Sequence, residues 1–217
     1  MVGVGGQPLP RVQCLLAASE DGRVPVYRYP GNEEGTRYPT HELSPLARRV
    51  CQLAATELSL RSAPPHHSQL AQQGRGTSTS SGDAAEASGY FNHVVVNYYR
   101  DETDFIAAHQ DKRLDIERGT VIGALSVYPS AAVAPRELEL LSTDGNKRRQ
   151  VIPLPQGSLF LLGDRTNQEF QHSVRPATAA TTAASAPQAR ISFTLRRCAT
   201  FRTPNGELVG QGGGLRM

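Results

Sequence analysis

Residues 94–111, VVVNYYRDETDFIAAHQD, predict two strands joined by a polar turn. The first strand, residues 94–99, is apolar and rich in β-branched side chains, and the second covers residues 104–111. Side chains alternate between the two faces of a strand, so His109 and Asp111 are expected on the same face. An imidazole and a carboxylate on one face supply two of the three ligands of a facial metal triad.

By itself, a His-x-Asp pair is more often two surface polar residues than a metal site, so a third ligand decides the interpretation. His172 lies several predicted strands later in the chain. That separation is long enough to cross a β-sandwich and return beside His109 and Asp111. Two histidines and one carboxylate hold one face of iron(II) and leave three positions for a co-substrate and oxygen. We therefore predict that His109, Asp111 and His172 bind the metal and form the catalytic centre.

The last predicted strand, residues 190–196, carries two cations on one face, Arg190 and Arg196. A small dicarboxylate that chelates iron needs a fixed cation for its far carboxylate, and the planar guanidinium fork suits that bidentate role. Asn97 and Tyr99 share a face of an earlier strand and offer neutral donors to the same ligand. Each residue also has an ordinary explanation, such as Arg196 capping a sheet edge or Tyr99 packing in the core.

The remaining segments predict a mainly β fold with one helix near the N-terminus. Residues 11–17 and 24–29 are expected to form a hairpin around the turn Glu20-Asp21-Gly22. About eight short strands at regular turn spacing favour a double-stranded β-helix, or jelly roll, over a parallel α/β fold. The later strands are expected at residues 120–128, 137–142, 150–152, 157–162 and 190–196.

One amphipathic helix is predicted from Pro45 to about Leu60. Ser44 is a favourable N-cap residue, and proline is favoured at the first helical position. Apolar side chains then recur at helical spacing and are expected to face the core. They are Leu46, Val50, Leu53, Ala54 and Leu58.

The chain of 217 residues is expected to form one domain, residues 10–203, with a flexible N-terminus (1–9) and a flexible tail (204–217). Two low-complexity stretches, 62–89 and 176–189, are interpreted as inserts, because small and polar residues cannot bury enough apolar area to offset the entropy of ordering. His66 and His67 in the first insert are interpreted as solvated.

Composition restricts the class of protein. No apolar run approaches the roughly 20 residues that a membrane helix requires, and residues 1–13 lack the regions of a signal peptide. The three cysteines have no CxxC spacing, which favours reduced thiols and an intracellular location, in the nucleus or the cytoplasm. The net charge of +3 is compatible with a nucleic-acid partner without requiring one. We expect a monomer.

From residue 10 to residue 201 the chain resembles the AlkB family of iron(II)- and 2-oxoglutarate-dependent dioxygenases. The ordered elements N-x-Y, H-x-D, a distal histidine and R-x5-R carry the resemblance. The matching stretches are residues 9–11, 26–31, 91–92, 97–101, 109–111, 121–126, 155–159, 171–173 and 190–196.

The resemblance implies the reaction and the roles of several residues. Fe(II), 2-oxoglutarate and O2 would be the cofactor and co-substrates, with oxidation of a substrate C–H bond coupled to formation of succinate and carbon dioxide. When the oxidised carbon is an N-methyl group, the products are formaldehyde and the demethylated base. The resemblance implies iron binding by His109, Asp111 and His172, and 2-oxoglutarate binding by Asn97, Tyr99, Arg190, Thr194 and Arg196.

The resemblance also implies a methylated DNA or RNA substrate, as in DNA dealkylation repair. Tyr27 and Tyr29 occupy positions where the family places aromatic side chains against a flipped base. Lys112 and Arg113 stand where repair enzymes carry acidic residues, and their charge would oppose a cationic base unless Asp115 or Glu117 neutralises it or the pair faces phosphates. Alternatives are a hydroxylase or demethylase of a protein or small molecule, and a non-catalytic jelly-roll binding module.

Overall fold

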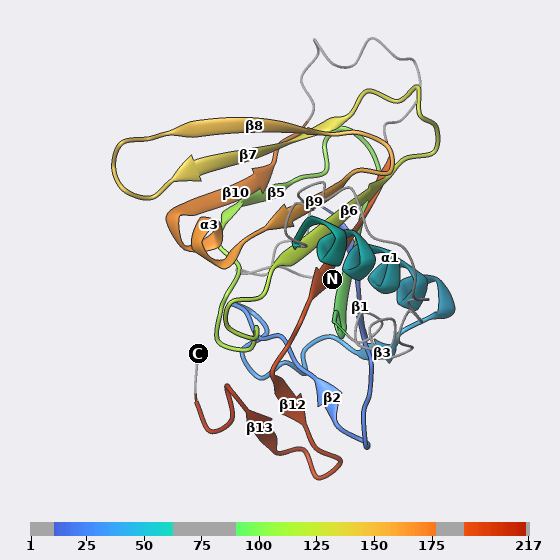
Figure 1. Ribbon diagram of the computed structural model, residues 1–217, viewed down its shortest axis with the longest axis vertical. Helices are drawn as coiled ribbons and strands as arrows, with labels where there is room; N and C mark the ends of the chain where they lie inside the picture. Colours follow the sequence, from blue (N-terminus) through green and yellow to red (C-terminus); the bar gives the residue numbers. More distant parts are fainter. Residues whose placement is uncertain (1–10, 63–89, 177–188, 216–217) are drawn as a thin grey trace, which may run out of the picture.

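The computed structural model describes residues 11–62, 90–176 and 189–215 (Figure 1). Most of the predicted inserts, the two histidines at 66 and 67, and residues 1–9 lie outside these ranges. The elements in chain order are β1 (Val12–Ala17), β2 (Val24–Pro25), β3 (Thr40–Glu42), α1 (Pro45–Ser62), β4 (His93–Tyr99), β5 (Ile106–His109), β6 (Ile122–Val127), β7 (Arg136–Ser142), β8 (Arg149–Leu154), β9 (Leu159–Leu162), α3 (Asp164–Glu169), β10 (Phe170–Val174), β11 (Arg190–Arg196), β12 (Thr200–Arg202) and β13 (Leu208–Gly210).

Two facing sheets confirm the predicted jelly roll. The larger sheet has the order β3-β1-β4-β11-β6-β9, and the smaller has the order β5-β10-β7-β8. Consecutive strands β4 and β5 belong to different sheets, so the predicted turn between them is the crossing from one layer to the other. Asp104 fixes this crossing, because its carboxylate accepts hydrogen bonds from the backbone N–H and the guanidinium of Arg100.

Strand β11 connects the core to the candidate site through its alternation. Phe193 and Leu195 belong to the hydrophobic cluster that packs against α1. Arg190, Thr194 and Arg196 line a cavity on the opposite face. One strand therefore supplies both packing and polar chemistry, as period-two alternation allows.

Helix α1 begins as predicted, with the Ser44 hydroxyl accepting the backbone N–H of Ala47 at 3.2 Å. Its buried face differs from the predicted stripe. Leu46 and Leu53 are exposed, at 65% and 52%, and Leu58 is half-buried. Small residues instead allow a close approach to the larger sheet, and so the prediction was wrong for the leucines and right for Val50 and Ala54. The buried side chains of the helix are Ala47, Val50, Cys51, Ala54 and Ala55.

The predicted N-terminal hairpin is only partly correct. The turn at Asp21-Gly22 forms, with both residues at positive φ and a bridge between Glu20 and Arg23. The return strand does not pair with β1. Strand β2 is limited to Val24–Pro25 and pairs with β12, while β1 pairs with β4 and β3.

The C-terminal segment also differs from the prediction of a flexible tail. Strand β13 pairs with β12, and together with β2 they form a third small sheet at the end of the molecule opposite the β7–β8 hairpin (Figure 1). Arg28 donates to the carbonyl oxygens of Gly212 and Leu215 in this segment, and the Gln211 side chain donates to the carbonyl oxygen of Ile116. The low apolar content of residues 204–215 misled the prediction, because backbone pairing, not side-chain burial, orders them. Within the described residues, neither helix combines the length and the apolar character needed to cross a membrane.

Candidate active site

The three predicted metal ligands lie together between the two sheets. His109 on β5 is directly opposite His172 on β10, and their ring centroids are 4.3 Å apart. Asp111 follows the end of β5, and its Oδ1 lies 3.7 Å from Nε2 of His109. One potential ligand atom from each of the three residues lies within 4.8 Å of the others. This is a set of two histidines and one carboxylate at a spacing that fits a single metal ion.

The two imidazoles are held by different surroundings. Nδ1 of His109 lies 2.8 Å from the carbonyl oxygen of Ala107, a contact that fixes the ring and leaves Nε2 on the side of Asp111. Burial, together with the nearby His109, lowers the pKa of His172 to about 4. Metal binding requires the neutral imidazole, so His172 is in the competent form at neutral pH. Its Nδ1 is buried and meets no hydrogen-bond partner within the described ranges.

Asp111 is held charged by an arginine that leaves one of its oxygens free. Nε and Nη2 of Arg196 both donate to Oδ2 of Asp111, at 3.0 and 2.8 Å. Burial alone would raise the pKa of Asp111, but the charge of Arg196 and the contact with His109 outweigh it and hold that pKa well below its ordinary value. Oδ1, on the side of His109, is the oxygen available to a metal.

The backbone of Asp111 is clamped by a residue that sequence reasoning missed. Asn167 on α3 accepts the backbone N–H of Asp111 with its Oδ1 and donates from Nδ2 to the Asp111 carbonyl, both at 2.9 Å. The Asn167 side chain is 2% exposed. Helix α3 was not predicted, although Gly163-Asp164 is a usable helix-start signal. Asn167 is a positioning residue for the metal-binding carboxylate.

A cavity of about 870 Å³ opens beside the three ligands. It is lined by every residue that was predicted to bind 2-oxoglutarate. Arg190 is 2% exposed and donates to the hydroxyl of Ser126, from Nη2 at 2.9 Å. Nη1 of Arg190 and Nη1 of Arg196 are both buried and have no hydrogen-bond partner among the described residues. Native proteins rarely leave buried polar atoms unpaired, so two such donors in one cavity fit a bound dicarboxylate.

The neutral donors surround these arginines in different ways. The ring of Tyr99 packs under Arg190, with the guanidinium carbon 5.1 Å from the ring centroid. Asn97 lies 3.5 Å from the hydroxyl of Thr194 through its Nδ2, while its Oδ1 accepts from Arg11 at 3.0 Å. Arg11 thus joins the cavity wall, a role that the sequence did not indicate.

Of the four residues predicted to contact substrate, three line the cavity and Arg113 does not. Tyr27, Tyr29 and Lys112 line the cavity, and the two tyrosine rings are 5.7 Å apart. Tyr27 is buried, packs 4.1 Å from the guanidinium of Arg196, and accepts the backbone N–H of Lys112. Arg113 is absent from the described residues that line the cavity. Its guanidinium instead pairs with Asp164 at 2.7 Å, and substrate binding by Arg113 stays a prediction.

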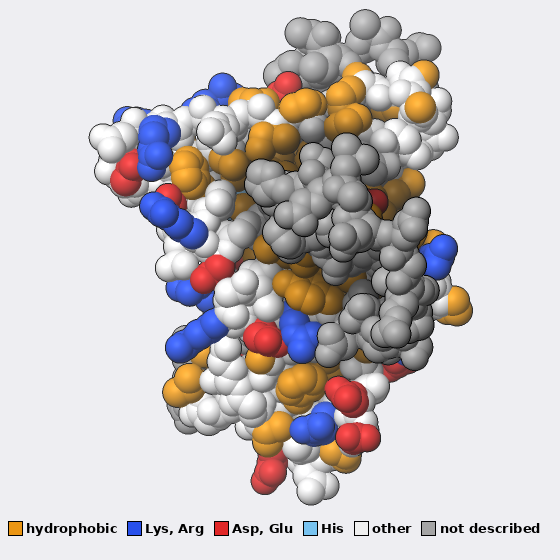
Figure 2. Space-filling model, in the orientation of Figure 1, with side chains coloured by type: hydrophobic (Ala, Val, Ile, Leu, Met, Phe, Trp, Pro, Cys, Tyr) orange, Lys and Arg blue, Asp and Glu red, His pale blue; other side chains and the backbone are white. Residues whose placement is uncertain are grey.

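Surface charges near the site are largely paired. In the face shown in Figure 2, Lys and Arg side chains lie along the edge that carries the β7–β8 hairpin, interspersed with Asp and Glu. Arg148 pairs with Asp144 at 2.8 Å, and Arg165 pairs with Glu169 at 2.7 Å. This edge is therefore not a surface of one sign.

Comparisons with known proteins identify relatives of this chain. Human DNA oxidative demethylase ALKBH2 is 29% identical over 86 residues, which are 39% of this chain and 33% of the relative. The mouse alpha-ketoglutarate-dependent dioxygenase alkB homolog 3 is 30% identical over 87 residues, 39% of this chain and 30% of the relative. These matches span about a third of each curated relative. The solved structure of OsALKBH1 aligns over 69% of this chain and 60% of its own, with 14% identity and a TM-score of 0.38.

The family assignment comes from a longer match. The sequence model described as the 2OG-Fe(II) oxygenase superfamily matches residues 3–196, which is most of the chain. The named relatives confirm the AlkB-like resemblance, and the His-Asp-His cluster agrees with the iron in the family's description. The protein belongs to the 2OG-Fe(II) oxygenase superfamily.

Proposed function

We propose that this protein is an iron(II)- and 2-oxoglutarate-dependent dioxygenase that demethylates N-methylated nucleobases in DNA or RNA. The observation that carries the dioxygenase part is the convergence, in one cavity, of three metal-ligand side chains with two buried arginines that each keep an unpaired Nη1. The demethylase part is supported by the relative described as a DNA oxidative demethylase.

The protein's own residues would bind the metal and 2-oxoglutarate and position Asp111. When bound, iron and 2-oxoglutarate would supply the oxidation of a C–H bond by O2, with 2-oxoglutarate converted to succinate and carbon dioxide. His109, His172 and Oδ1 of Asp111 would hold the metal. Arg196 keeps Asp111 charged, and Asn167 keeps it in place. Arg190, the first residue of β11, would bind the far carboxylate through its unpaired Nη1.

The atoms balance for an N-methyl substrate. One oxygen atom of O2 enters succinate and the other enters the methyl group, which becomes a hydroxymethyl group. The C–N bond then breaks and the carbon leaves as formaldehyde, while the hydroxyl proton passes to the ring nitrogen of an uncharged base or to water from a cationic base. A methyl group inside a duplex cannot reach the cavity, so the base must be single-stranded or extruded. Tyr29, which is half-buried beside Tyr27, offers an aromatic surface for such a base.

An intracellular location, in the nucleus or the cytoplasm, is part of the proposal. Cys14, Cys51 and Cys198 are all free thiols in the structure, which suits a reducing compartment.

The test is a panel of single-stranded DNA and RNA oligomers, each with one N-methylated base, incubated with protein, Fe(II), 2-oxoglutarate and air. We expect formaldehyde and succinate in equal amounts for at least one oligomer, and neither product with His109→Ala. Succinate without formaldehyde from any oligomer would reject the nucleobase substrate. Failure to bind 2-oxoglutarate in the presence of Fe(II), with no succinate, would reject the dioxygenase.

A further inference from the structure

The outer part of the cavity is lined by two cations that have no acidic partner among the described residues. Lys112 is exposed and makes no ion pair there. Arg11 is half-buried, and its hydrogen bonds go to neutral acceptors, Oδ1 of Asn97 at 3.0 Å and the carbonyl oxygen of Phe105 at 3.3 Å. Burial lowers the pKa of Arg11, which remains a cation at neutral pH. Both residues line the cavity.

The acidic residues that would compensate these charges are engaged elsewhere. Asp115 pairs with Arg28 at 2.6 Å, Glu117 pairs with Arg197, and Asp164 pairs with Arg113. Among the described residues that line the cavity, the one carboxylate is that of Asp111. Its Oδ2 is already held by Arg196, and its Oδ1 is the metal-side oxygen.

The charge balance of the cavity is therefore positive. A doubly charged metal and the doubly charged 2-oxoglutarate would cancel each other. The excess of Arg11, Lys112, Arg190 and Arg196 over Asp111 would remain. A positively charged methylated base would enter against these like charges. An uncharged base meets no such opposition.

Hydrogen-bonding capacity points the same way. Lysine and arginine side chains are donors only, so they require acceptor atoms on the ligand. In 3-methylthymine and 3-methyluracil the methylated nitrogen lies between two carbonyl oxygens. In the cation 1-methyladenine an amino donor flanks it, and in the cation 3-methylcytosine an amino donor takes the place of one carbonyl. Donor facing donor leaves both groups unpaired, which is unfavourable when water is excluded.

We propose that the base taken by this cavity is an uncharged N3-methylated pyrimidine-2,4-dione, with Lys112 and Arg11 as the specificity-determining donors for its carbonyl oxygens. This inference rests on the proposed demethylase function and adds the substrate class. The same ring occurs in DNA as 3-methylthymine and in RNA as 3-methyluracil.

The experiment compares oligomers that differ at one base. Single-stranded DNA with 3-methylthymine, 1-methyladenine or 3-methylcytosine, and RNA with 3-methyluracil, are each assayed for kcat/KM by mass spectrometry. Binding to the protein with Fe(II) and 2-oxoglutarate is measured separately by fluorescence anisotropy without oxygen. We expect the neutral dione to be preferred over the cations at least tenfold in both measurements. The DNA and RNA arms distinguish the source of the ring.

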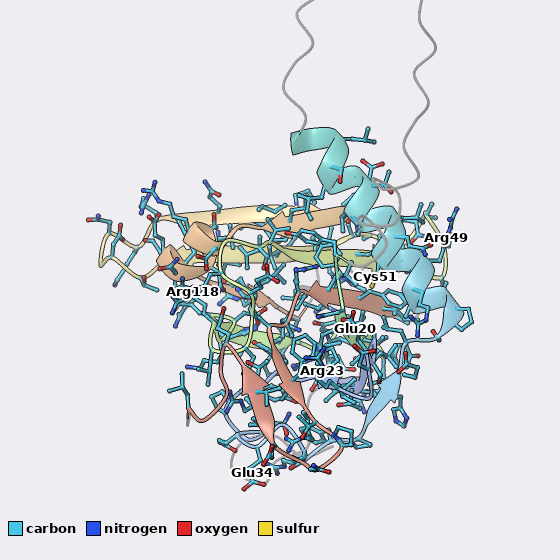
Figure 3. The ribbon with its side chains drawn as sticks, turned by 60° about the horizontal axis from the view of Figure 1, so that its bottom comes forward. Glu20, Arg23, Glu34, Arg49, Cys51 and Arg118 are labelled. Carbon is cyan, nitrogen blue, oxygen red and sulfur yellow. The ribbon has the colours of Figure 1, made fainter. Side chains whose placement is uncertain are left out.

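Charge variants of Lys112 test the cause of the preference. Lys112→Glu should lower the dione-to-cation ratio at least tenfold, and Lys112→Gln should give an intermediate ratio. Lys112 is exposed, so both variants should keep the melting temperature. The matched control is Arg49→Glu, the same reversal of charge on the outer side of α1, away from the cavity (Figure 3). It should leave the ratio unchanged.

Two results would overturn the inference while leaving the proposed function intact. One is more efficient demethylation of 1-methyladenine or 3-methylcytosine than of the diones. The other is an unchanged ratio in Lys112→Glu. If no oligomer is demethylated although succinate is formed, the nucleobase proposal itself is rejected, and the substrate class is rejected with it.

Discussion

Two buried arginine–aspartate pairs lie close together in this fold. They differ in how many of their hydrogen-bonding groups find a partner in the protein. Arg28 binds Asp115 through Nε and Nη2, and donates further to the carbonyl oxygens of Leu215 and Gly212. Its backbone N–H also donates to Asp115. Arg196 donates to Oδ2 of Asp111, and its Nη1 has no partner in the part of the chain that the structure describes. The first pair is closed by the protein, whereas the second is open toward the cavity.

This difference separates a structural pair from a functional one. A buried ion pair stabilises a fold only when its remaining hydrogen-bonding groups are satisfied, as those of Arg28 and Asp115 are. The Arg196–Asp111 pair keeps unmet capacity on the side of His109 and His172. Unsatisfied buried groups in a native structure call for an explanation, and a metal with a bound dicarboxylate supplies one. Mutations should therefore affect stability at the closed pair and ligand binding at the open one.

The largest expected effect is the loss of catalysis in His109→Ala. Removing one of three metal ligands should reduce turnover more than about 100-fold, since even the loss of an outer-shell partner of a metal ligand costs about 10- to 100-fold. The visible charge-transfer absorption of the anaerobic complex with Fe(II) and 2-oxoglutarate should disappear. His109 is about one-third exposed, so the free energy of unfolding should change by less than about 1 kcal/mol.

A variant that lost activity only through unfolding would contradict this prediction, and urea denaturation distinguishes the two cases. His41→Ala, at an exposed histidine on β3, is the matched control and should keep both the absorption and the turnover.

Asp115→Ala, in the closed pair, should lower stability and leave ligand binding unchanged. The variant leaves the buried Arg28 charge unpaired, which should lower the free energy of unfolding by about 3–5 kcal/mol. For a chain of this size the melting temperature should fall by roughly 6–20 °C. Differential scanning calorimetry measures this. Below the lowered melting temperature, the affinity for 2-oxoglutarate in the presence of Fe(II) should remain that of the wild type.

The double variant Arg28→Met/Asp115→Leu removes both charges together. It should recover most of the lost stability, because an apolar pair of similar volume has no charge to desolvate. If the double variant were no more stable than Asp115→Ala, the instability would not come from an unpaired charge.

Arg190 resembles Arg196 in that it lines the cavity and keeps an unpaired Nη1, but it does not contact a metal ligand. In Arg190→Lys the planar fork is lost, so the dissociation constant for 2-oxoglutarate should rise about 10- to 100-fold. Titration of 2-oxoglutarate into the anaerobic Fe(II) protein measures the change. An unchanged dissociation constant would remove Arg190 from the co-substrate site. Arg175→Lys, at an exposed arginine on the outer side, is the control.

The open site was largely predictable from the sequence, and the closed pair was not. Short spacing and strand alternation placed His109 near Asp111, and Arg190 on one face with Arg196. These patterns are local, so they survive errors in the topology. The partners of Arg28 are the C-terminal carbonyl oxygens of Gly212 and Leu215, and backbone acceptors carry no residue-type signal.

Two other features escaped prediction for related reasons. The Asn167 clamp depends on a six-residue helix that is too short for helical periodicity to show. The face of α1 was misjudged because hydrophobicity favoured leucines, whereas close packing against the sheet selected small side chains such as Ala47 and Ala54. Sequence periodicity identifies an apolar stripe but not how closely the neighbouring element approaches.

The smallest effect concerns His93, which burial and the nearby charge of Arg196 keep neutral. Burial and the nearby Arg196 charge lower its pKa to about 3, and its Nδ1 has no partner. The unfolded chain takes up this proton near pH 6.5, but the folded protein does not, so the contribution of His93 to stability is complete above pH 6.5 and declines as the pH falls toward 3. His93→Phe should remove this decline. The free energy of unfolding from pH 7 to pH 5 should therefore fall by about 2 kcal/mol less in the variant than in the wild type. Urea denaturation at both pH values measures the difference, and equal falls in the two proteins would show that His93 does not remain neutral beside Arg196.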